Sequence, residues 1–229
     1  MQTTTRPQKG YRGLAMEGAV ARWYAGLRRS GSQIDEYRRE AARLTGDLPD
    51  GAAVLEVAPG PGYFAIEMAR LGRFRVTGLD ISRTFVEIAT ENARQAAVQV
   101  DFRQGDAASM PFEDGSFDLV VCQAAFKNFT RPGRALDEMH RVLRGGGTAI
   151  VQDMDKEASG AAIRREVNGM GLKRVNAFMT RWTLGMLRRR AYTRREFEGL
   201  AAASAFGTCE VRPRGIGLEV LLRRRGAAG

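Results

Sequence analysis

The sequence predicts an α/β fold: a doubly wound, mostly parallel sheet of seven strands that ends in an antiparallel hairpin. Two observations predict it. Between residues 53 and 152, short apolar runs alternate with segments of helical periodicity, the pattern of strand–helix–strand units in a parallel sheet. After residue 207, two strand-like runs lie close together in the chain, which predicts a hairpin joined across residues 213–216.

The chain before the first strand is expected to be helical. Residues 1–10 are polar and without periodicity, and we expect them to be frayed. Two amphipathic helices are predicted over Leu14–Leu27 and Ile34–Leu44, separated by residues 30–32. The turn at residues 48–51 then leads into the sheet.

The parallel strands are predicted from apolar runs that end in polar or glycine-rich turns. They are expected at Ala53–Val57, Phe74–Leu79, Val98–Phe102, Phe117–Cys122 and Thr148–Gln152. The first crossover helix is expected from about Gly62 to about Leu71, and Ser82 is the expected N-cap of the next one. The run Gly145–Gly147 is expected to end the helix that precedes the last parallel strand.

The strand–helix alternation breaks after the fifth strand. Residues 156–187 are expected to be a helical insertion that carries one apolar stripe. Its members are Leu172, Val175, Met179, Trp182 and Met186. Such a stripe usually packs against its own domain, and the alternative is contact with a membrane. Thr193 is the expected cap of a last helix, before hairpin strands at residues 208–212 and 217–222.

Composition limits the classes of protein that fit. Cys122 and Cys209 are too few for a disulfide framework or a zinc site, so both are expected to be core or near-core thiols, and no metal is expected. No apolar run approaches the roughly 20 residues of a membrane span, and no leader is recognised, so the expected location is cytoplasmic. Residues 160–229 hold 15 basic and 5 acidic residues. This excess indicates a solvated basic face or a surface for nucleic acid or an anionic membrane.

The turn after the first strand is the central local motif. Glycines in Gly60-Pro61-Gly62 let a ligand approach the backbone, and the helix that follows offers free N–H groups to an anionic group. With Ala65 the turn satisfies G-x-G-x-x-G/A, and Asp80 follows Gly60 by 20 positions. That is also the dinucleotide fingerprint, so the turn predicts a nucleotide-type cofactor without deciding which.

The motifs further along the chain indicate which nucleotide-type cofactor the turn binds. Gly105-Asp106-Ala107 follows the third strand, Met110-Pro111-Phe112-x-Asp114-x-Ser116-Phe117-Asp118 leads into the fourth, and residues 141–147 precede the fifth. In these motifs, residues 53–152 resemble the class I S-adenosylmethionine-dependent methyltransferases. The resemblance is to the small-molecule branch that includes the ubiquinone/menaquinone-biosynthesis-type enzymes. It implies a Rossmann-like fold and S-adenosyl-L-methionine as cofactor. No Tyr-x-x-x-Lys pair is present, which argues against a dehydrogenase.

The resemblance also implies roles for the first-motif residues. Glu56 is similar to the family's first-motif acid, and the turn through Ala58, Pro59, Gly60 and Gly62 is similar to its glycine triplet. Ala58 stands where the first glycine is usual, which puts in doubt how closely that turn approaches the cofactor. The turn is expected to cradle the methionine end.

The nucleoside end is expected to bind to the following strands. Asp80 resembles the acid that accepts both ribose hydroxyls, and Ile81 would pack on the adenine. The Asp106 carboxylate would accept from the exocyclic amine, with an N–H at Ala107 facing a ring nitrogen. Gln123, at the end of the fourth strand, either contacts the adenosyl group or only finishes the strand.

Family analogy puts the acceptor over residues 123–129. Candidate acceptor contacts are Tyr24, Phe126, Lys127, Met179 and Trp182. Lys127 either pairs with an anionic substrate or lies at the rim as a solvated charge. Apolar helices before and after the core would form a lid for a hydrophobic or lipid-like acceptor. Tyr11 and Tyr37 are equally placed to reach the cofactor.

No catalytic base is assigned, because a sulfonium is already activated and positioning alone supplies roughly 7 to 11 kcal/mol. His140 is expected to be a surface or packing residue of its helix, and Asp118 to be structural. We expect one methyltransferase domain over residues 1–229. It comprises an N-terminal helical cap (1–50), a cofactor-binding core (51–153), the insertion (154–192), and the last helix with the hairpin (193–229).

The predicted function is methyl transfer from S-adenosylmethionine to a small acceptor. RNA or DNA methylation is the first competing hypothesis because of the basic C-terminal region, although no Asn-Pro-Pro-Tyr-type motif follows the fourth strand. A noncatalytic cofactor-binding protein is the second. The sequence does not give the acceptor or the oligomeric state.

Overall fold

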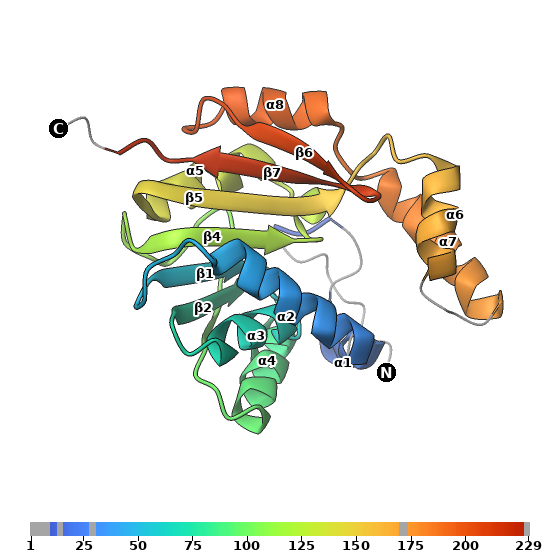
Figure 1. Ribbon diagram of the computed structural model, residues 1–229, viewed down its shortest axis with the longest axis horizontal. Coiled ribbons are helices and arrows are strands. Elements are labelled where there is room, and N and C mark those ends of the chain that lie inside the picture. Colours follow the sequence, from blue (N-terminus) through green and yellow to red (C-terminus); the bar gives the residue numbers. More distant parts are fainter. Residues whose placement is uncertain (1–9, 13–15, 28–30, 170–173, 227–229) are drawn as a thin grey trace, which may run out of the picture.

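The sheet of the protein has seven strands in the order β3-β2-β1-β4-β5-β7-β6 (Figure 1). The computed structural model describes residues 10–12, 16–27, 31–169 and 174–226. The strands are β1 Ala53–Val57, β2 Arg75–Asp80, β3 Asp101–Gln104, β4 Phe117–Gln123, β5 Leu143–Met154, β6 Glu210–Arg214 and β7 Gly217–Arg223. β1 to β5 run parallel, and β7 pairs antiparallel with both β5 and β6. The predicted fold class is confirmed.

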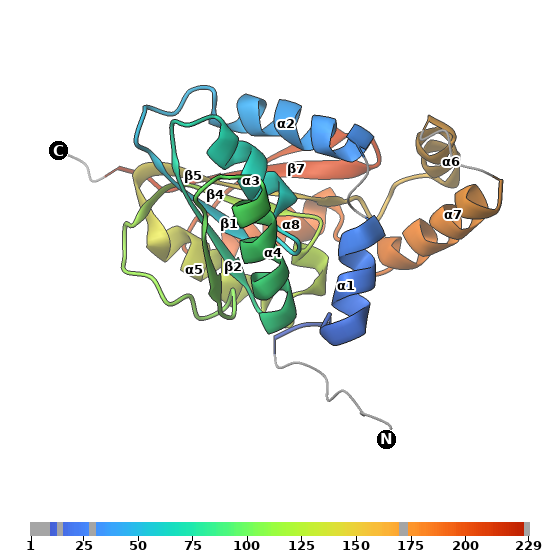
Figure 2. The same ribbon diagram turned by 90° about the horizontal axis from the view of Figure 1, so that it is seen from below.

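Helices cover both faces of this sheet. They are α1 Gly18–Leu27, α2 Gly31–Thr45, α3 Tyr63–Arg70, α4 Arg83–Gln95, α5 Pro132–Val142, α6 Gly160–Gly169, α7 Arg174–Arg188 and α8 Arg194–Ala202, with a short 3-10 turn at Phe126–Asn128. α2 packs on α3, whereas α5 packs on α8. Figure 2 shows α2, α3 and α4 on one side of the strands and α5 and α8 on the other.

Two apolar cores lie on the two faces. The core beside α3 contains the fully buried Val54, Ala65 and Met68, while the larger core beside α5 contains Leu55, Val120 and Leu136. Neighbouring residues of β1 therefore enter opposite cores, because side chains alternate across a strand. Burial on both faces explains why β1 reads as an unbroken apolar run with one exception, Glu56.

The helix caps follow the predictions. The Ser82 hydroxyl accepts the Phe85 N–H at 3.0 Å, and Thr193 forms a reciprocal capping box with Glu196. These caps fix where α4 and α8 begin.

Several boundaries differ from the predictions; for example, α1 begins at Gly18 and β5 at Leu143. β3 begins at Asp101 rather than Val98, because the ladder with β2 pairs Thr77 with Asp101 and Asp80 with Gln104. Residues 145–147 do not end a helix: α5 ends at Val142, and the glycines lie inside β5. The glycine run accommodates a register shift against β4 between Phe117 and Leu119. α2 begins at Gly31, earlier than predicted.

Two members of the predicted apolar stripe of the insertion are exposed. Trp182 is 58% exposed and Met186 is 48% exposed, so the expected packing of these two side chains against the domain is wrong. Leu172 and the side chains of Val175 and Met179 lie outside the described part of the chain. No helix in the described part is long and apolar enough to cross a membrane.

Candidate cofactor and acceptor site

The turn from β1 into α3 needs glycine for two different reasons. Gly60 and Gly62 both have left-handed backbones, with φ of 54° and 79°. A Cβ on Gly62 would lie 2.7 Å from Phe102 and 2.8 Å from Ala89, so no side chain fits there. A Cβ on Gly60 would meet nothing within 4 Å. Gly62 therefore closes the packing of the turn, and Gly60 leaves room on its Cβ side for a bound group.

Ala58 lies in the left-handed region too, with φ of 58°. Its N–H donates to the Leu79 carbonyl at 2.7 Å, which ties the end of β1 to β2. An L-residue in this conformation costs roughly 1–2 kcal/mol, a penalty that glycine avoids. Ala58, which stands where glycine is usual, thus introduces backbone strain at the start of the turn.

Asp80 joins this turn to the next strand. Its Oδ2 accepts the Gly60 N–H at 2.9 Å and its Oδ1 accepts the Ser82 N–H at 2.8 Å. Burial raises the pKa of Asp80 to about 6, although these N–H donors oppose the shift. Each oxygen keeps a second lone pair, so the carboxylate can still accept from a vicinal diol.

Glu56 is the least satisfied polar group of the site. It is 3% exposed, and its Oε2 has no hydrogen-bond partner among the described residues. Burial, together with the nearby Asp80 charge, raises the pKa of Glu56 to about 8. A cationic group beside this oxygen would supply the missing partner, and the α-ammonium of S-adenosylmethionine is such a group. The residues present therefore fit this cofactor.

A strap from the N-terminal segment crosses the predicted adenine site. Tyr11 bridges to Phe129, and the Arg12 N–H donates to the Asn128 carbonyl at 2.6 Å. A Cβ on Gly10 would lie 2.7 Å from Ile81 and 3.0 Å from the Asp106 carboxylate, so this strap touches both predicted adenine contacts.

Tyr11 is the residue of the strap that faces the site. Burial raises the pKa of Tyr11, and Tyr24 and the Asp80 carboxylate add to the shift. Its hydroxyl stays protonated at neutral pH and can donate a hydrogen bond. Tyr37, in contrast, packs against Phe64 between α2 and α3, with ring centroids 6.2 Å apart. The two tyrosines are therefore not equally placed: Tyr11 lies near Asp80, whereas Tyr37 lies between two helices. The sequence did not reveal this difference, because the contact of the strap joins residues that are far apart in the chain.

The remaining nucleoside-end candidates already have protein partners. Asp106 accepts the Ala108 N–H at 2.8 Å and pairs with Arg131 at 2.8 Å, which closes the turn that contains Ala107. Gln123 donates to the Gln152 side chain at 2.8 Å. Both side chains are partly exposed, so the turn and the strand end keep them at the surface of the site.

The exit of β4 is organised by a buried ion pair. Lys127 Nζ lies 2.7 Å from Asp153 Oδ1, and the Lys127 backbone N–H donates to Asp153 Oδ2 at 2.8 Å. The Lys127 residue is 4% exposed, so it does not lie at a solvated rim. Asp153, at the end of β5, was not among the predicted site residues. Only the pairing of β4 with β5 brings it to Lys127.

The aromatic candidates separate into two groups. Phe126 is fully buried, with ring centroids 5.3 Å from Phe129 and Phe197 and 5.7 Å from Tyr192. Its side chain therefore supports the wall of the site from behind instead of meeting an acceptor. The Tyr24 ring packs against Phe85 at 5.9 Å. Trp182 is exposed on α7, and the Met179 side chain lies outside the described residues.

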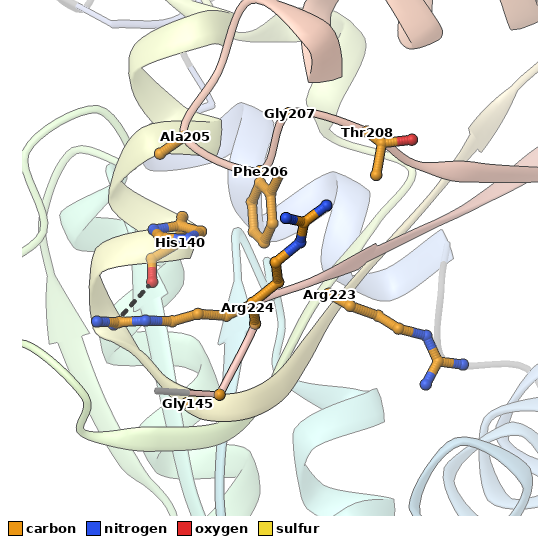
Figure 3. A pocket seen from close by; sticks show the side chains of 10 residues that line it. His140, Gly145, Ala205, Phe206, Gly207, Thr208, Arg223 and Arg224 are labelled. Atoms are coloured by element: carbon orange, nitrogen blue, oxygen red, sulfur yellow. Dashed lines mark hydrogen bonds between the residues drawn. The ribbon is translucent and has the colours of Figure 1, made fainter. Parts of the chain in front are cut away.

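His140 lies at the opposite end of the sheet. It borders a hollow of about 660 Å³, with Phe206 and Arg224 beside it (Figure 3). The imidazole packs on the Phe206 ring at 5.0 Å, and burial and the Arg224 charge lower its pKa. Asp118, also at that end, accepts the Ala53 N–H and pairs with Arg144. Both residues are structural, as predicted.

The described residues contain no group of three or more His, Cys, Asp or Glu side chains that could hold a metal ion. Cys122 is fully buried and Cys209 is partly buried, and neither is in a disulfide.

A glycine-rich β1–α3 turn, an acid ending β2 and a reversed β7 together define the class I methyltransferase architecture. Comparison with known proteins agrees. Residues 55–151 match the family model described as "Methyltransferase domain". Residues 55–151 are thus similar to a methyltransferase domain, as the sequence predicts.

Individual proteins are similar to this chain in sequence or in fold. The demethylmenaquinone methyltransferase of Deinococcus radiodurans is 34% identical over 128 residues, covering 56% of this chain and 53% of that protein. The chain thus spans about half the length of the curated relatives it matches. A candidate S-adenosyl-L-methionine-dependent methyltransferase from Methanococcus maripaludis has a TM-score of 0.71 at 18% identity, covering 100% of this chain and 99% of that one. For a SAM-dependent methyltransferase from Aquifex aeolicus the TM-score is 0.67 at 16% identity, covering 88% and 97%.

Replacing Ala58 by glycine tests the strain at the turn. We expect Ala58→Gly to raise the free energy of unfolding by about 0.5–1 kcal/mol, since relief of strain exceeds the added chain entropy. Urea unfolding measures the change. Ala97, with φ of 53° after α4, is the matched control. Ala97→Gly should stabilise similarly without changing cofactor affinity, while Ala58→Gly should change both. A destabilised Ala58→Gly variant would contradict the assignment of strain.

Glu56 should make stability depend on pH. Between its ordinary pKa of 4.5 and about 8, the folded state holds a proton that the unfolded state releases. The free energy of unfolding therefore falls as pH rises through this window, at up to about 1.4 kcal/mol per pH unit. Glu56→Gln should remove this slope, making the variant more stable than the wild type at pH 8 in thermal unfolding.

Glu56→Gln should also weaken binding of S-adenosylmethionine by about tenfold or more in calorimetry, because the α-ammonium of the cofactor loses its carboxylate partner. Glu67 is the control: it is equally buried but pairs with Arg38 and Arg70. Glu67→Gln should lower stability at pH 8. Equal pH slopes in wild type and Glu56→Gln would show that Glu56 is not protonated in the fold.

The Lys127–Asp153 pair can be tested by a double-mutant cycle. Lys127→Met alone leaves a buried carboxylate uncompensated and should cost about 3–5 kcal/mol of unfolding free energy. Lys127→Met with Asp153→Asn should recover most of the loss, since the amide oxygen still accepts the backbone N–H. Additive losses in urea unfolding would refute a coupled pair.

Proposed function

We propose that this protein transfers the methyl group of S-adenosylmethionine to a small, apolar, lipid-like acceptor with a quinone- or phenol-type ring. The observation that carries the proposal is Glu56 Oε2, which is buried near Asp80 without a hydrogen-bond partner among the described residues, at a turn with room at Gly60. In this assignment Glu56 and the turn bind the methionine end. Asp80 binds the ribose, and Ile81 and Asp106 border the adenine.

The bound cofactor supplies an activated methyl group on its sulfonium. The chain's own residues then have to align the acceptor and exclude water. Tyr11 covers the site from the strap, and its protonated hydroxyl can donate to an acceptor oxygen. No histidine serves as a base, because His140, the only histidine of the chain, lies at the far end of the sheet.

Two observations support an apolar ring as the acceptor. The wall behind the β4 exit is a cluster of aromatic rings, and the one buried cation there, Lys127, is already neutralised by Asp153. The Deinococcus radiodurans relative is named for demethylmenaquinone, a quinone. Neither favours an anionic acceptor.

A nucleic-acid acceptor has less support. Several arginines of the basic C-terminal region are engaged within the protein: Arg214 pairs with Glu40, Arg212 pairs with Glu210, and Arg224 donates to the His140 and Arg141 carbonyls. These contacts engage arginines of the closing hairpin and of the segment that follows it, which lowers the charge that the hairpin offers to a nucleic acid.

Methyl transfer to soluble naphthol and short-chain quinol acceptors tests the proposal, with mass spectrometry detecting the methylated product. Asp80→Asn should weaken S-adenosylmethionine binding by about ten- to a hundredfold, equivalent to ~1–3 kcal/mol, because it removes charge while keeping an acceptor for one N–H. Asp101→Asn, an exposed carboxylate of β3, is the control and should bind normally.

The outcomes separate the hypotheses. Transfer to RNA but not to ring acceptors would replace the proposed substrate class. Unchanged affinity in Asp80→Asn would mean that the ribose lies elsewhere.

A further inference from the structure

Helix α7 carries a stripe of large apolar side chains that the protein leaves uncovered. Phe178 is 61% exposed, Trp182 58% and Met186 48%. Their spacing of four residues places them on one face of the helix. We propose that this stripe, together with the basic residues around it, binds the surface of an anionic lipid bilayer.

The opposite face of α7 already makes the packing contacts that hold the helix in place. Leu184 packs against the buried Ile163 and Val167 of α6, and Arg188 donates to the Ala158 carbonyl at 2.8 Å. At about 100° per residue, Leu184 points about 160° away from Trp182 and Met186, and about 120° away from Phe178. The exposed stripe is therefore not needed to attach α7 to α6, and it is free to meet another surface.

Charge around the stripe favours an anionic occupant. Residues 160–195 contain ten basic residues and a single acidic one, Glu166. Arg189 and Arg190 are exposed just beyond the end of α7, and Arg164 and Arg165 are exposed on α6. An apolar helix face bordered by arginines is the composition of helices that lie in the lipid headgroup region. The same charge disfavours pairing of this face with a second copy.

The position of the stripe relates it to the site. Figures 1 and 2 show α6 and α7 extending beyond the end of the sheet to which β1 and β4 point, with α1 beyond the same end. α1 exposes Trp23 at 66% and Val20 at 41%. Docking through α7 would bring this end of the sheet to the bilayer. That a lipid-like acceptor is taken from there rests on the proposed function, whereas docking itself does not.

The two tryptophans of the chain allow a direct test. In Trp23→Phe, the fluorescence reports Trp182 alone. We expect vesicles of phosphatidylglycerol and phosphatidylcholine to shift its emission to shorter wavelength, brominated acyl chains to quench it, and added salt to weaken binding. Phosphatidylcholine alone should bind more weakly.

Two double variants separate the contribution of the apolar stripe to vesicle binding from that of the basic residues. Phe178→Ser with Met186→Ser, in the Trp23→Phe background, should lower vesicle affinity by at least about tenfold. Arg165→Glu with Arg189→Glu should do the same. The matched control is Arg83→Glu with Arg94→Glu on α4, where the side chains are 78% and 74% exposed; this pair carries the same charge change and should bind vesicles more nearly as the parent does.

Cofactor binding and transfer to a soluble acceptor, both without vesicles, serve as folding controls and should persist in the stripe variants. An unshifted Trp182 emission, or equal vesicle affinity in parent and stripe variants, would overturn the proposal. Protection of Trp182 by concentration-dependent dimerisation without lipid would overturn it too. Vesicle binding without methyl transfer to any acceptor would instead contradict the proposed function alone.

Discussion

The site depends on two carboxylates buried side by side at the ends of β1 and β2. Asp80 holds the turn and the start of α4 together through the Gly60 and Ser82 N–H groups. Glu56 lies deeper, with one oxygen unpartnered among the described residues. Burial raises the pKa of both acids, so ionising them inside the fold costs free energy, and a cation beside them would reduce that cost. The same burial that makes the two carboxylates costly to ionise thus favours a cationic group beside them.

A second constraint acts through the backbone of the same turn. Ala58 and Gly62 both adopt left-handed conformations, but only at Gly62 would a Cβ collide with its neighbours. The fold therefore tolerates alanine at the first position and could not tolerate it at the last. This difference explains how the motif can depart from its usual glycine without losing the shape of the turn.

Sequence reasoning succeeded where the signal was local. The limits of β1, the Ser82 and Thr193 caps and the order of the motifs all come from residues that lie within a few positions of one another. It failed where pairing across the sheet decides the outcome. β3 begins at an exposed, charged residue, Asp101, because β2 provides its pairing partners. The apolar residues before Asp101 led to a predicted start that is three residues too early.

The candidate site shows the same division. Asp80 and Glu56 could be recognised from their motif, but the partner of Lys127 could not, because Asp153 is 26 residues away and reaches it only through the β4–β5 ladder. The Tyr11 strap is harder still, since its contact with Phe129 joins the N-terminal segment to the β4 exit. No periodicity marks a segment of this kind.

The strap and the α7 stripe impose different requirements on the same end of the sheet. The strap touches Ile81 and Asp106, so an adenine placed there has to share that surface with Gly10 or displace it. The stripe, by contrast, is exposed without any such contact. In the proposed binding mode, an acceptor from a bilayer would approach from the side of α7, whereas the strap borders the adenine end of the predicted cofactor site. The two features therefore act on different parts of the same site.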